Sequence, residues 1–166
     1  DWLATASGKT GGGLGGALYA RVRMEAAALK VKGLFMECLP DSTKDCPETD
    51  LRHQNQARLR FYERYGARPI VGTDYEAPVR PGDTCMPHLV FDGLDRDRPL
   101  RRSFSRKVVR AILERKYATL CPPAYVDRVV ESFRDDPVRL RPFRYVTAQA
   151  TQIGRASCRE RVCHRV

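Results

Sequence analysis

A glycine-rich stretch near the start of the chain constrains the fold more than any other feature of the sequence. Residues 10–18 read TGGGLGGAL, with five glycines among nine residues. Ordering them is costly, because glycine loses more backbone entropy on folding than any other residue. An apolar run, DWLATA, precedes the stretch, and helical periodicity follows it. A bare turn between a strand and a helix exposes backbone N–H groups at the positive end of the helix dipole, so we expect it to bind phosphate.

Three phosphate-binding interpretations of this turn compete with an ordinary flexible turn before a helix. Residues 8–10, GKT, resemble the end of a P-loop. That motif requires a glycine five positions before Gly8, where this chain has Leu3. A dinucleotide-binding fingerprint is matched in part by Gly11, Gly13 and Gly16, yet Glu37 is the only carboxylate in the next expected strand. The third interpretation is a loop for the diphosphate of an acyl-CoA.

This third interpretation depends on two motifs that resemble the GNAT family of N-acetyltransferases. The segment ATASGKTGGGLGGAL is similar to the family's pyrophosphate loop, V-x-P-x-x-[RQ]-G-x-G-[IL]-G-x-x-L, although Thr10 stands where the family prefers Arg or Gln. The segment NQARLRFYERYGARPI resembles N-x-x-A-x-x-x-Y-[ED]-[KR]-x-G-F, with matches at Asn55, Tyr62, Glu63, Arg64 and Gly66. The resemblance covers residues 1–94 and the C-terminal part of that fold, so we expect the chain to lack its N-terminal elements.

The resemblance implies acetyl-CoA as co-substrate and an amine as acceptor, with no metal and no acyl-enzyme. The residues expected to bind the cofactor through the loop are Thr10, Gly11, Gly13, Leu14, Gly15 and Gly16. Tyr62 would be the general acid that protonates the leaving thiolate, because a phenol with a pKa of about 10 is mostly protonated at neutral pH. Asn55 would contact the cofactor or cap the splayed strands; an alternative is a solvated polar residue near a helix start.

Each of these assignments has a structural alternative. The alternative for Tyr62 is a core aromatic beside Phe61, and Tyr65 is a lesser candidate for the acid. Glu37, on an expected strand, could act as a base through a water molecule. His53 and His88 we interpret as ordinary structural residues. The acceptor amine does not follow from the sequence.

Hydrophobic periodicity predicts an α/β arrangement. In the terms of the resemblance, this is a partial GNAT-like mixed sheet with flanking helices, followed by a small helical extension. The expected strands cover residues 1–6, 34–39, 67–77 and 88–94, and the expected helices cover 14–32, 51–65, 104–117 and 122–133. Gly33 and Gly66 are the expected helix stops. The stripes expected to face inward are Leu14, Leu18, Val22, Ala26 and Leu29 on the first helix, and Val108, Ala111 and Ile112 on the third.

The positive charge of the chain is concentrated in its second half. The formal net charge is +10, and residues 95–144 contribute +7 of it through 14 Lys/Arg against 7 Asp/Glu. We expect a GNAT-like acyl-CoA-binding domain in residues 1–94, a basic helical linker or extension in 95–146 and a disordered tail in 147–166. For the basic segment we expect a linker with solvated charged faces, and the alternative is a nucleic-acid-binding role.

The tail contains a segment of unusual origin. Residues 153–162, IGRASCRERV, back-translate without a gap to a common sequencing-adapter read, so we expect residues from about 152 onward to derive from laboratory DNA. The six cysteines include no C-x-x-C pair, and we expect reduced thiols in a cytoplasmic protein. No apolar run is long enough for a membrane span, so we expect no membrane partner.

A second resemblance concerns residues 61–141. The run from FYERYGARPIVGT to CPPAYVDRVVESFRDDPVRLR is similar to bacterial proteins in which a GNAT-like region precedes a zinc-dependent deacetylase of the histone deacetylase type. It implies a deacetylase domain after Val146 in the same chain. The alternative to an acetyltransferase is therefore a non-catalytic GNAT-like module fused to a deacetylase or amidohydrolase.

Overall fold

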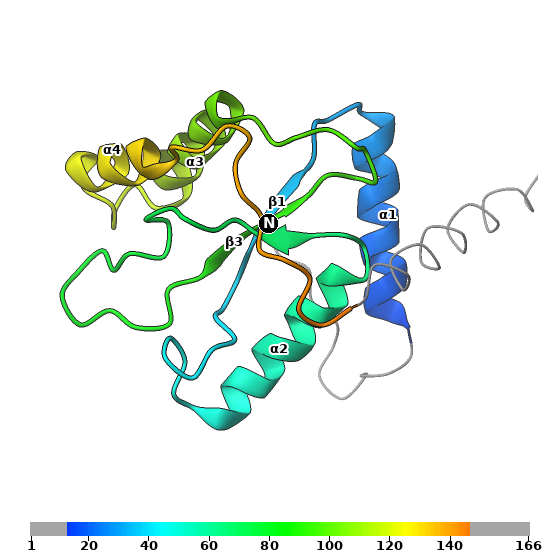
Figure 1. Cartoon of the computed structure of the whole chain (residues 1–166), viewed down its shortest axis with the longest axis horizontal. Helices are drawn as coiled ribbons and strands as arrows, with labels where there is room; N and C mark the ends of the chain where they lie inside the picture. The colour runs from blue at the N-terminus through cyan, green and yellow to red at the C-terminus, as the bar shows by residue number, and fades with distance from the viewer. Residues whose placement is uncertain (1–12, 147–166) are drawn as a thin grey trace, which may run out of the picture.

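Four helices and a small antiparallel sheet make up residues 13–146, the part of the chain that the computed structural model describes (Figure 1). The elements are α1 (Leu14–Ala28), β1 (Leu34–Cys38), α2 (Thr49–Glu63), β2 (Arg68–Pro69), β3 (His88–Asp92), α3 (Arg102–Lys116) and α4 (Pro123–Ser132). The prediction of a mixed α/β class is confirmed. The expected strand at 1–6, the loop residues Thr10 and Gly11, and the tail at 147–166 lie outside the described residues.

β3 is the central strand, with β1 on one side and β2 on the other, both antiparallel to it. β1 pairs with β3 from Leu34↔Asp92 to Cys38↔His88. The expected strand at 67–77 is wrong in length, because only Arg68–Pro69 pair with β3. Beyond Pro69 the Ile70 amide still donates to the Leu89 carbonyl of β3 at 2.8 Å, but the chain then pairs with a C-terminal segment: Ile70 bridges to Leu140, and the Val71 amide donates to the Arg139 carbonyl at 3.0 Å.

The two faces of the sheet carry separate apolar clusters. Leu89 and Phe91 of β3 point to the larger cluster, which also takes in residues of α3 and α4 such as Val109 and Val129. Val90, between them in sequence, points to the smaller cluster around Leu59 of α2. This alternation follows from the two-residue period of a strand. The larger cluster thus joins residues from both sides of residue 94.

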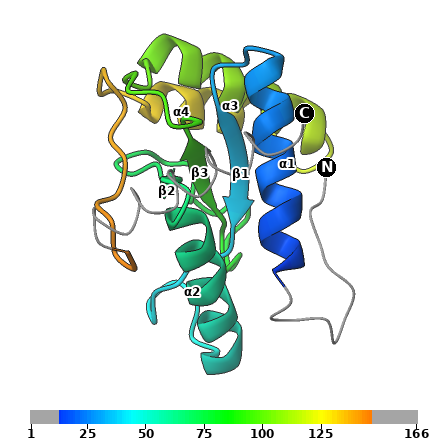
Figure 2. The same ribbon diagram turned by 90° about the vertical axis from the view of Figure 1, so that its right-hand side faces the viewer.

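The inward face predicted for α1 is wrong. Its predicted stripe is largely exposed, with relative exposures of 47% at Leu14, 37% at Leu18, 41% at Val22 and 75% at Leu29; only Ala26 is buried. The buried side chains are instead Tyr19, Arg23 and Ala26. Tyr19 donates to Asp92 Oδ2 at 2.6 Å and Arg23 Nε donates to the same atom at 2.8 Å. Bonds to a buried carboxylate at the end of β3 therefore set the face of this helix, which lies beside β1 (Figure 2).

The remaining predictions of secondary structure hold with two adjustments. On α3 the buried residues are Ser105, Val109 and Leu113, whereas the predicted Val108, Ala111 and Ile112 are only half-buried. α1 ends at Ala28, so Gly33 does not stop it. Gly66 does close α2, at φ 82. Across residues 13–146, no helix combines the length and the apolar character that crossing a bilayer requires.

Candidate functional site

The turn into α1 presents bare backbone at the start of the helix. Gly13 is the N-cap residue, with φ 72, and no atom within the described residues lies within 4 Å of where its Cβ would be. The first helical turn, which includes Leu14, Gly15 and Gly16, carries no acidic side chain. The first amides of a helix have no intrahelical acceptor and sit at the positive end of its dipole. The arrangement can therefore hold an anion.

The C-terminal end of α2 packs against this turn. The hydroxyl of Tyr65 donates to the carbonyl of Gly16 at 3.3 Å. Arg23 of α1 donates through Nη2 to the Tyr65 carbonyl at 3.4 Å. The structure thus brings the lesser acid candidate of the sequence, Tyr65, next to the glycine turn.

Tyr62, the predicted acid, lies in the seam between α1 and α2. It is half-buried, and its ring meets that of Tyr19 nearly edge-on at a centroid distance of 5.1 Å and that of Phe61 at 5.2 Å. Burial, followed by the nearby Cys38 thiol, raises the pKa of Tyr62. Its hydroxyl has no hydrogen-bond partner within residues 13–146. The ring of Tyr62 therefore packs against other aromatic rings, while its hydroxyl stays protonated and makes no hydrogen bond within the described residues.

Asn55 is not the solvated polar residue that the sequence offered as an alternative. It is fully buried, and its Nδ2 donates to the Pro40 carbonyl at 2.9 Å, which anchors the loop between β1 and α2. Its Oδ1 has no partner among the described residues. Because Asn55 precedes Tyr62 by seven residues, the two lie about 10 Å apart along the axis of α2. The contacts of Asn55 are to the β1–α2 loop, not to the glycine turn.

Glu37, the candidate base, points to the opposite face of the sheet from Tyr62. It lies on the same side of β1 as Phe35, which packs on the larger cluster, whereas Met36 and Tyr62 pack on the smaller one. Tyr75 donates to Glu37 Oε1 at 2.6 Å, and Tyr117 and Lys116 both donate to Oε2. Burial opposes ionisation, but these three bonds outweigh it and lower the pKa of Glu37.

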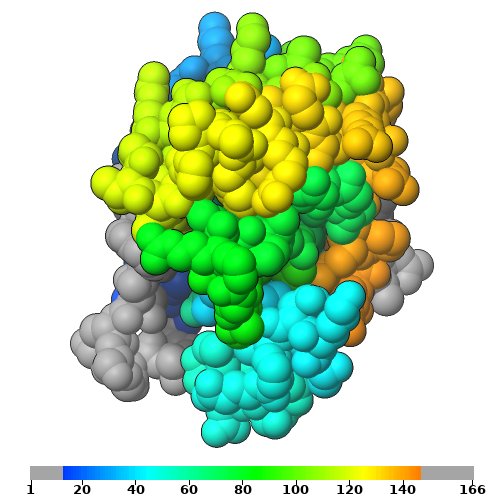
Figure 3. Space-filling view, turned by 90° about the vertical axis from the view of Figure 1, so that its left-hand side faces the viewer, coloured from blue at the N-terminus to red at the C-terminus, as the bar shows by residue number. Residues whose placement is uncertain are grey.

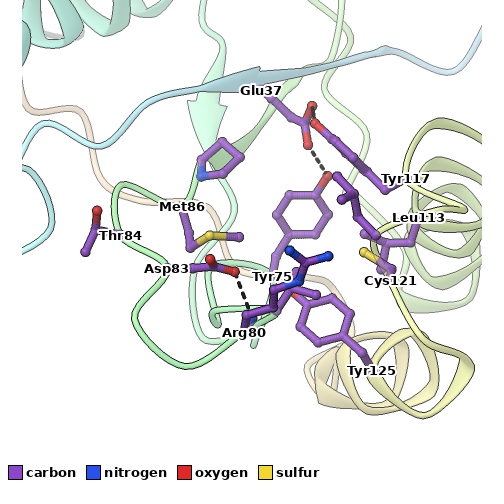
Figure 4. Close-up of a pocket in the computed structure, with 13 residues that line it drawn as sticks. Glu37, Tyr75, Arg80, Asp83, Thr84, Met86, Leu113, Tyr117, Cys121 and Tyr125 are labelled. Atoms are coloured by element: carbon purple, nitrogen blue, oxygen red, sulfur yellow. Dashed lines mark hydrogen bonds between the residues drawn. The ribbon is translucent and has the colours of Figure 1, made fainter.

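Glu37 lines a pocket of about 350 Å³ that sequence reasoning missed (Figure 4). The 75–87 loop, Leu113 of α3, the connection between α3 and α4, and the start of α4 form its other walls. Figure 4 shows the Tyr75 hydroxyl pointing to the Glu37 carboxylate, with Met86 on one side and Leu113 and Cys121 on the other. No local signal could have revealed this site, because Tyr75 and Tyr117 are 38 and 80 residues away from Glu37.

His88 belongs to a buried polar network. Its Nε2 lies 3.3 Å from Asp41 Oδ1, and its Nδ1 lies 2.6 Å from Glu76 Oε1. Burial lowers the pKa of His88, but the hydrogen bonds to both carboxylates dominate and raise it to about 9. Arg141 and Tyr145 also donate to Asp41, at 3.0 and 2.5 Å. The network fastens the C-terminal segment to the sheet.

Glu63, a residue of the second motif, belongs to the same region. It is completely buried and accepts the backbone N–H of Tyr145 at 2.8 Å. His53 is exposed on α2. Cys38, Cys46, Cys85 and Cys121 are free thiols. Between residues 13 and 146, no three His, Cys, Asp or Glu side chains converge where they could hold a metal ion.

Comparison with known proteins returned no match. No protein-family model, no curated protein and no solved structure matches the chain. The resemblance of the two motifs to the GNAT family therefore stays a proposal.

Proposed function

We propose that this chain binds the diphosphate of acetyl-CoA at the glycine turn before α1 and transfers the acetyl group to an amine. The observation that carries the proposal is the turn itself. Gly13 bends with φ 72 into a helix whose first turn has neither a bulky polar cap nor an acidic side chain. Free amides and the helix dipole together favour a phosphate at this position.

The neighbours of the turn support a role for Tyr62. In the proposed reaction, a neutral amine attacks the thioester carbonyl, and the C–S bond breaks as the thiolate leaves. Tyr62 donates its phenolic proton to that sulfur, and the proton that the attacking nitrogen loses, directly or through water, restores the phenol. Its raised pKa keeps the proton on the phenol at neutral pH. Tyr62, near the end of α2, and Tyr65, just beyond it, both meet the Tyr19 ring of α1, at centroid distances of 5.1 and 5.0 Å.

A second candidate is a non-catalytic module that binds acyl-CoA within a longer protein carrying a zinc-dependent deacetylase. One observation favours it: the candidate base and the candidate acid do not face the same side of the sheet. Glu37 is held by Tyr75, Tyr117 and Lys116 on the α3–α4 side. The Glu37 carboxylate would therefore not act as a base for an amine that attacks a thioester beside Tyr62.

Calorimetric titration of the whole 166-residue chain with acetyl-CoA tests the cofactor site. Gly15→Asp places a carboxylate in the first turn of α1, and we expect it to weaken binding at least tenfold, which is about 1.4 kcal/mol. Ala27→Asp is the matched control, because it adds the same charge at an exposed position near the other end of α1. Equal affinities for the two variants would show that the turn does not hold the diphosphate.

A Tyr62→Phe variant tests the acid. Its ring can keep the contacts with Tyr19 and Phe61, so we expect an unchanged fold and an unchanged affinity for acetyl-CoA. With an amine that is turned over, kcat should fall about 10²-fold or more. Tyr65→Phe is the control. Full activity in Tyr62→Phe would assign the proton to another group, and acetyl-CoA binding without turnover of any amine would favour the non-catalytic module.

A further inference from the structure

We propose that the pocket between Glu37 and the α3–α4 hairpin is a binding site for a small organic cation, an ammonium group carried on an apolar body. This pocket lies on the opposite face of the sheet from Tyr62, so the proposal stands whether or not α1 binds a CoA. Figure 3 shows this side of the molecule, with the yellow α4 above the green segment that includes the 75–87 loop.

The size and the walls of the pocket suit a small molecule. Its volume of about 350 Å³ is within the usual range for ligand sites, roughly 300–1,000 Å³. Most of its walls are apolar or aromatic; the side chains of this kind are Tyr75, Val79, Met86, Pro87, Leu113, Tyr117, Leu120, Cys121 and Tyr125. Such walls favour a ligand whose body is apolar.

The polar end of the pocket accepts hydrogen bonds and does not offer them. Tyr75 gives its only hydroxyl proton to Glu37 Oε1 at 2.6 Å, and Tyr117 gives its proton to Oε2 at 2.7 Å. Both phenol oxygens therefore keep only lone pairs for a ligand. Glu37 Oε1 accepts this one bond within the described residues, and a carboxylate oxygen can accept about two. A ligand that reaches this end must donate.

The charge around that end favours a cationic donor. Glu37 is ionised, since its pKa is lowered, and only 15% of its side chain is exposed. Lys116 and Tyr117 both donate to Oε2, whereas Oε1 accepts one bond, from Tyr75, and so keeps more capacity to accept from a ligand. Aromatic rings attract cations, and two of the three tyrosines already have one nearby: Lys116 Nζ lies 4.9 Å from the ring centroid of Tyr117, and Arg128 Cζ lies 5.1 Å from that of Tyr125. Arg80 and Asp83 line the exposed rim of the pocket, where the Asp83 carboxylate accepts the Arg80 backbone N–H at 2.8 Å.

The probes are three compounds of one shape, titrated into the whole chain by calorimetry. Phenethylammonium carries the cation, 2-phenylethanol is the neutral analogue and 3-phenylpropanoate is the anionic analogue. We expect phenethylammonium to bind at least tenfold more tightly than either of the others. Tighter binding of the anion would mean that Arg80 and not Glu37 selects the ligand, and absence of binding by all three would also overturn the proposal.

Two variants locate the site. Glu37→Gln keeps the shape of the side chain but removes its charge, and we expect at least a tenfold loss of phenethylammonium affinity. Glu114→Gln is the matched control, since it removes one carboxylate from the exposed side of α3. Equal affinities for these two variants would overturn the proposal.

A Leu120→Lys variant tests the location of the ligand independently of Glu37, and so serves even if the Glu37 variant fails to fold. Leu120 is 49% exposed at the pocket, so the change does not disturb the core. A tethered ammonium there competes with a cationic ligand and repels it. We expect phenethylammonium binding to weaken at least tenfold, with no loss for 3-phenylpropanoate. Undiminished phenethylammonium binding in this variant would place the ligand elsewhere.

Discussion

Among single residues, His88 makes the sharpest prediction about stability. Its pKa is raised to about 9 in the folded chain by hydrogen bonds to Asp41 and Glu76, against about 6.5 for an ordinary histidine. The folded state therefore holds a proton that the unfolded state releases as the pH rises above 6.5. The stabilisation is complete below pH 6.5 and is lost as the pH rises towards 9.

We expect the free energy of unfolding to fall on the order of 1.5 kcal/mol between pH 6.5 and 8 because of His88. Burial also raises the pKa of Cys38, but a thiol contributes mainly above its ordinary pKa of about 8.5. Urea unfolding at several pH values measures the slope. His88→Gln should flatten it, while His53→Gln, at an exposed position, should leave it unchanged. A slope that survives in His88→Gln would assign the proton to another group.

At the scale of elements, the connection between α1 and β1 passes so close to β3 that only glycine fits at position 33. A Cβ at Gly33 would overlap the ring of Phe91 and would lie 2.7 Å from the Asp92 carbonyl oxygen. The carbonyl belongs to the ladder between β1 and β3, so it cannot move without loss of pairing. We therefore expect Gly33→Ala to destabilise the chain by about 2–3 kcal/mol.

Gly93→Ala is the matched control, because Gly93 directly follows β3 just as Gly33 directly precedes β1. There the nearest atoms to an added Cβ are 3.6 Å away, which is ordinary contact. Thermal or urea unfolding should show a small change for this variant and a large one for Gly33→Ala. Similar stabilities would mean that the two strands have room to separate at Gly33.

For the whole molecule, the shared apolar cluster decides whether the first 94 residues fold by themselves. Leu89 and Phe91 of β3 pack against Val109, Val129 and their neighbours on α3 and α4. Removal of residues 95–166 would expose that face of the sheet to water. We expect the truncated chain to lose cooperative unfolding, measured by circular dichroism during heating.

Phe133→Ala probes the same contact in the full-length chain. Phe133 is 1% exposed, and its loss should cost about 3–5 kcal/mol. Phe143→Ala, at a half-buried position of the C-terminal segment, is a control for loss of a phenylalanine outside this cluster. A truncated chain that unfolds cooperatively would show that α3 and α4 are dispensable for folding.

Local sequence signals predicted which segments become helices and strands. The positions of β1, β3 and α4 follow from short apolar runs and from the prolines at 122 and 123. Gly66 ends α2 because the chain needs a positive φ there. β2 is shorter than predicted, because the residues after Pro69 pair with the C-terminal segment, a contact between distant parts of the chain.

The sequence by itself thus determined the element order and the bare turn before α1, because periodicity, glycine and proline act over a few neighbouring residues. Only the tertiary structure decided which side chains face inward. Tyr19 and Arg23 are buried because Asp92, some 70 residues away, offers a carboxylate to both. It also placed Glu37 among Tyr75 and Tyr117, and on the other face of the sheet from Tyr62. The physical reason is that a buried charge needs partners, and these come from segments that meet only in the folded chain.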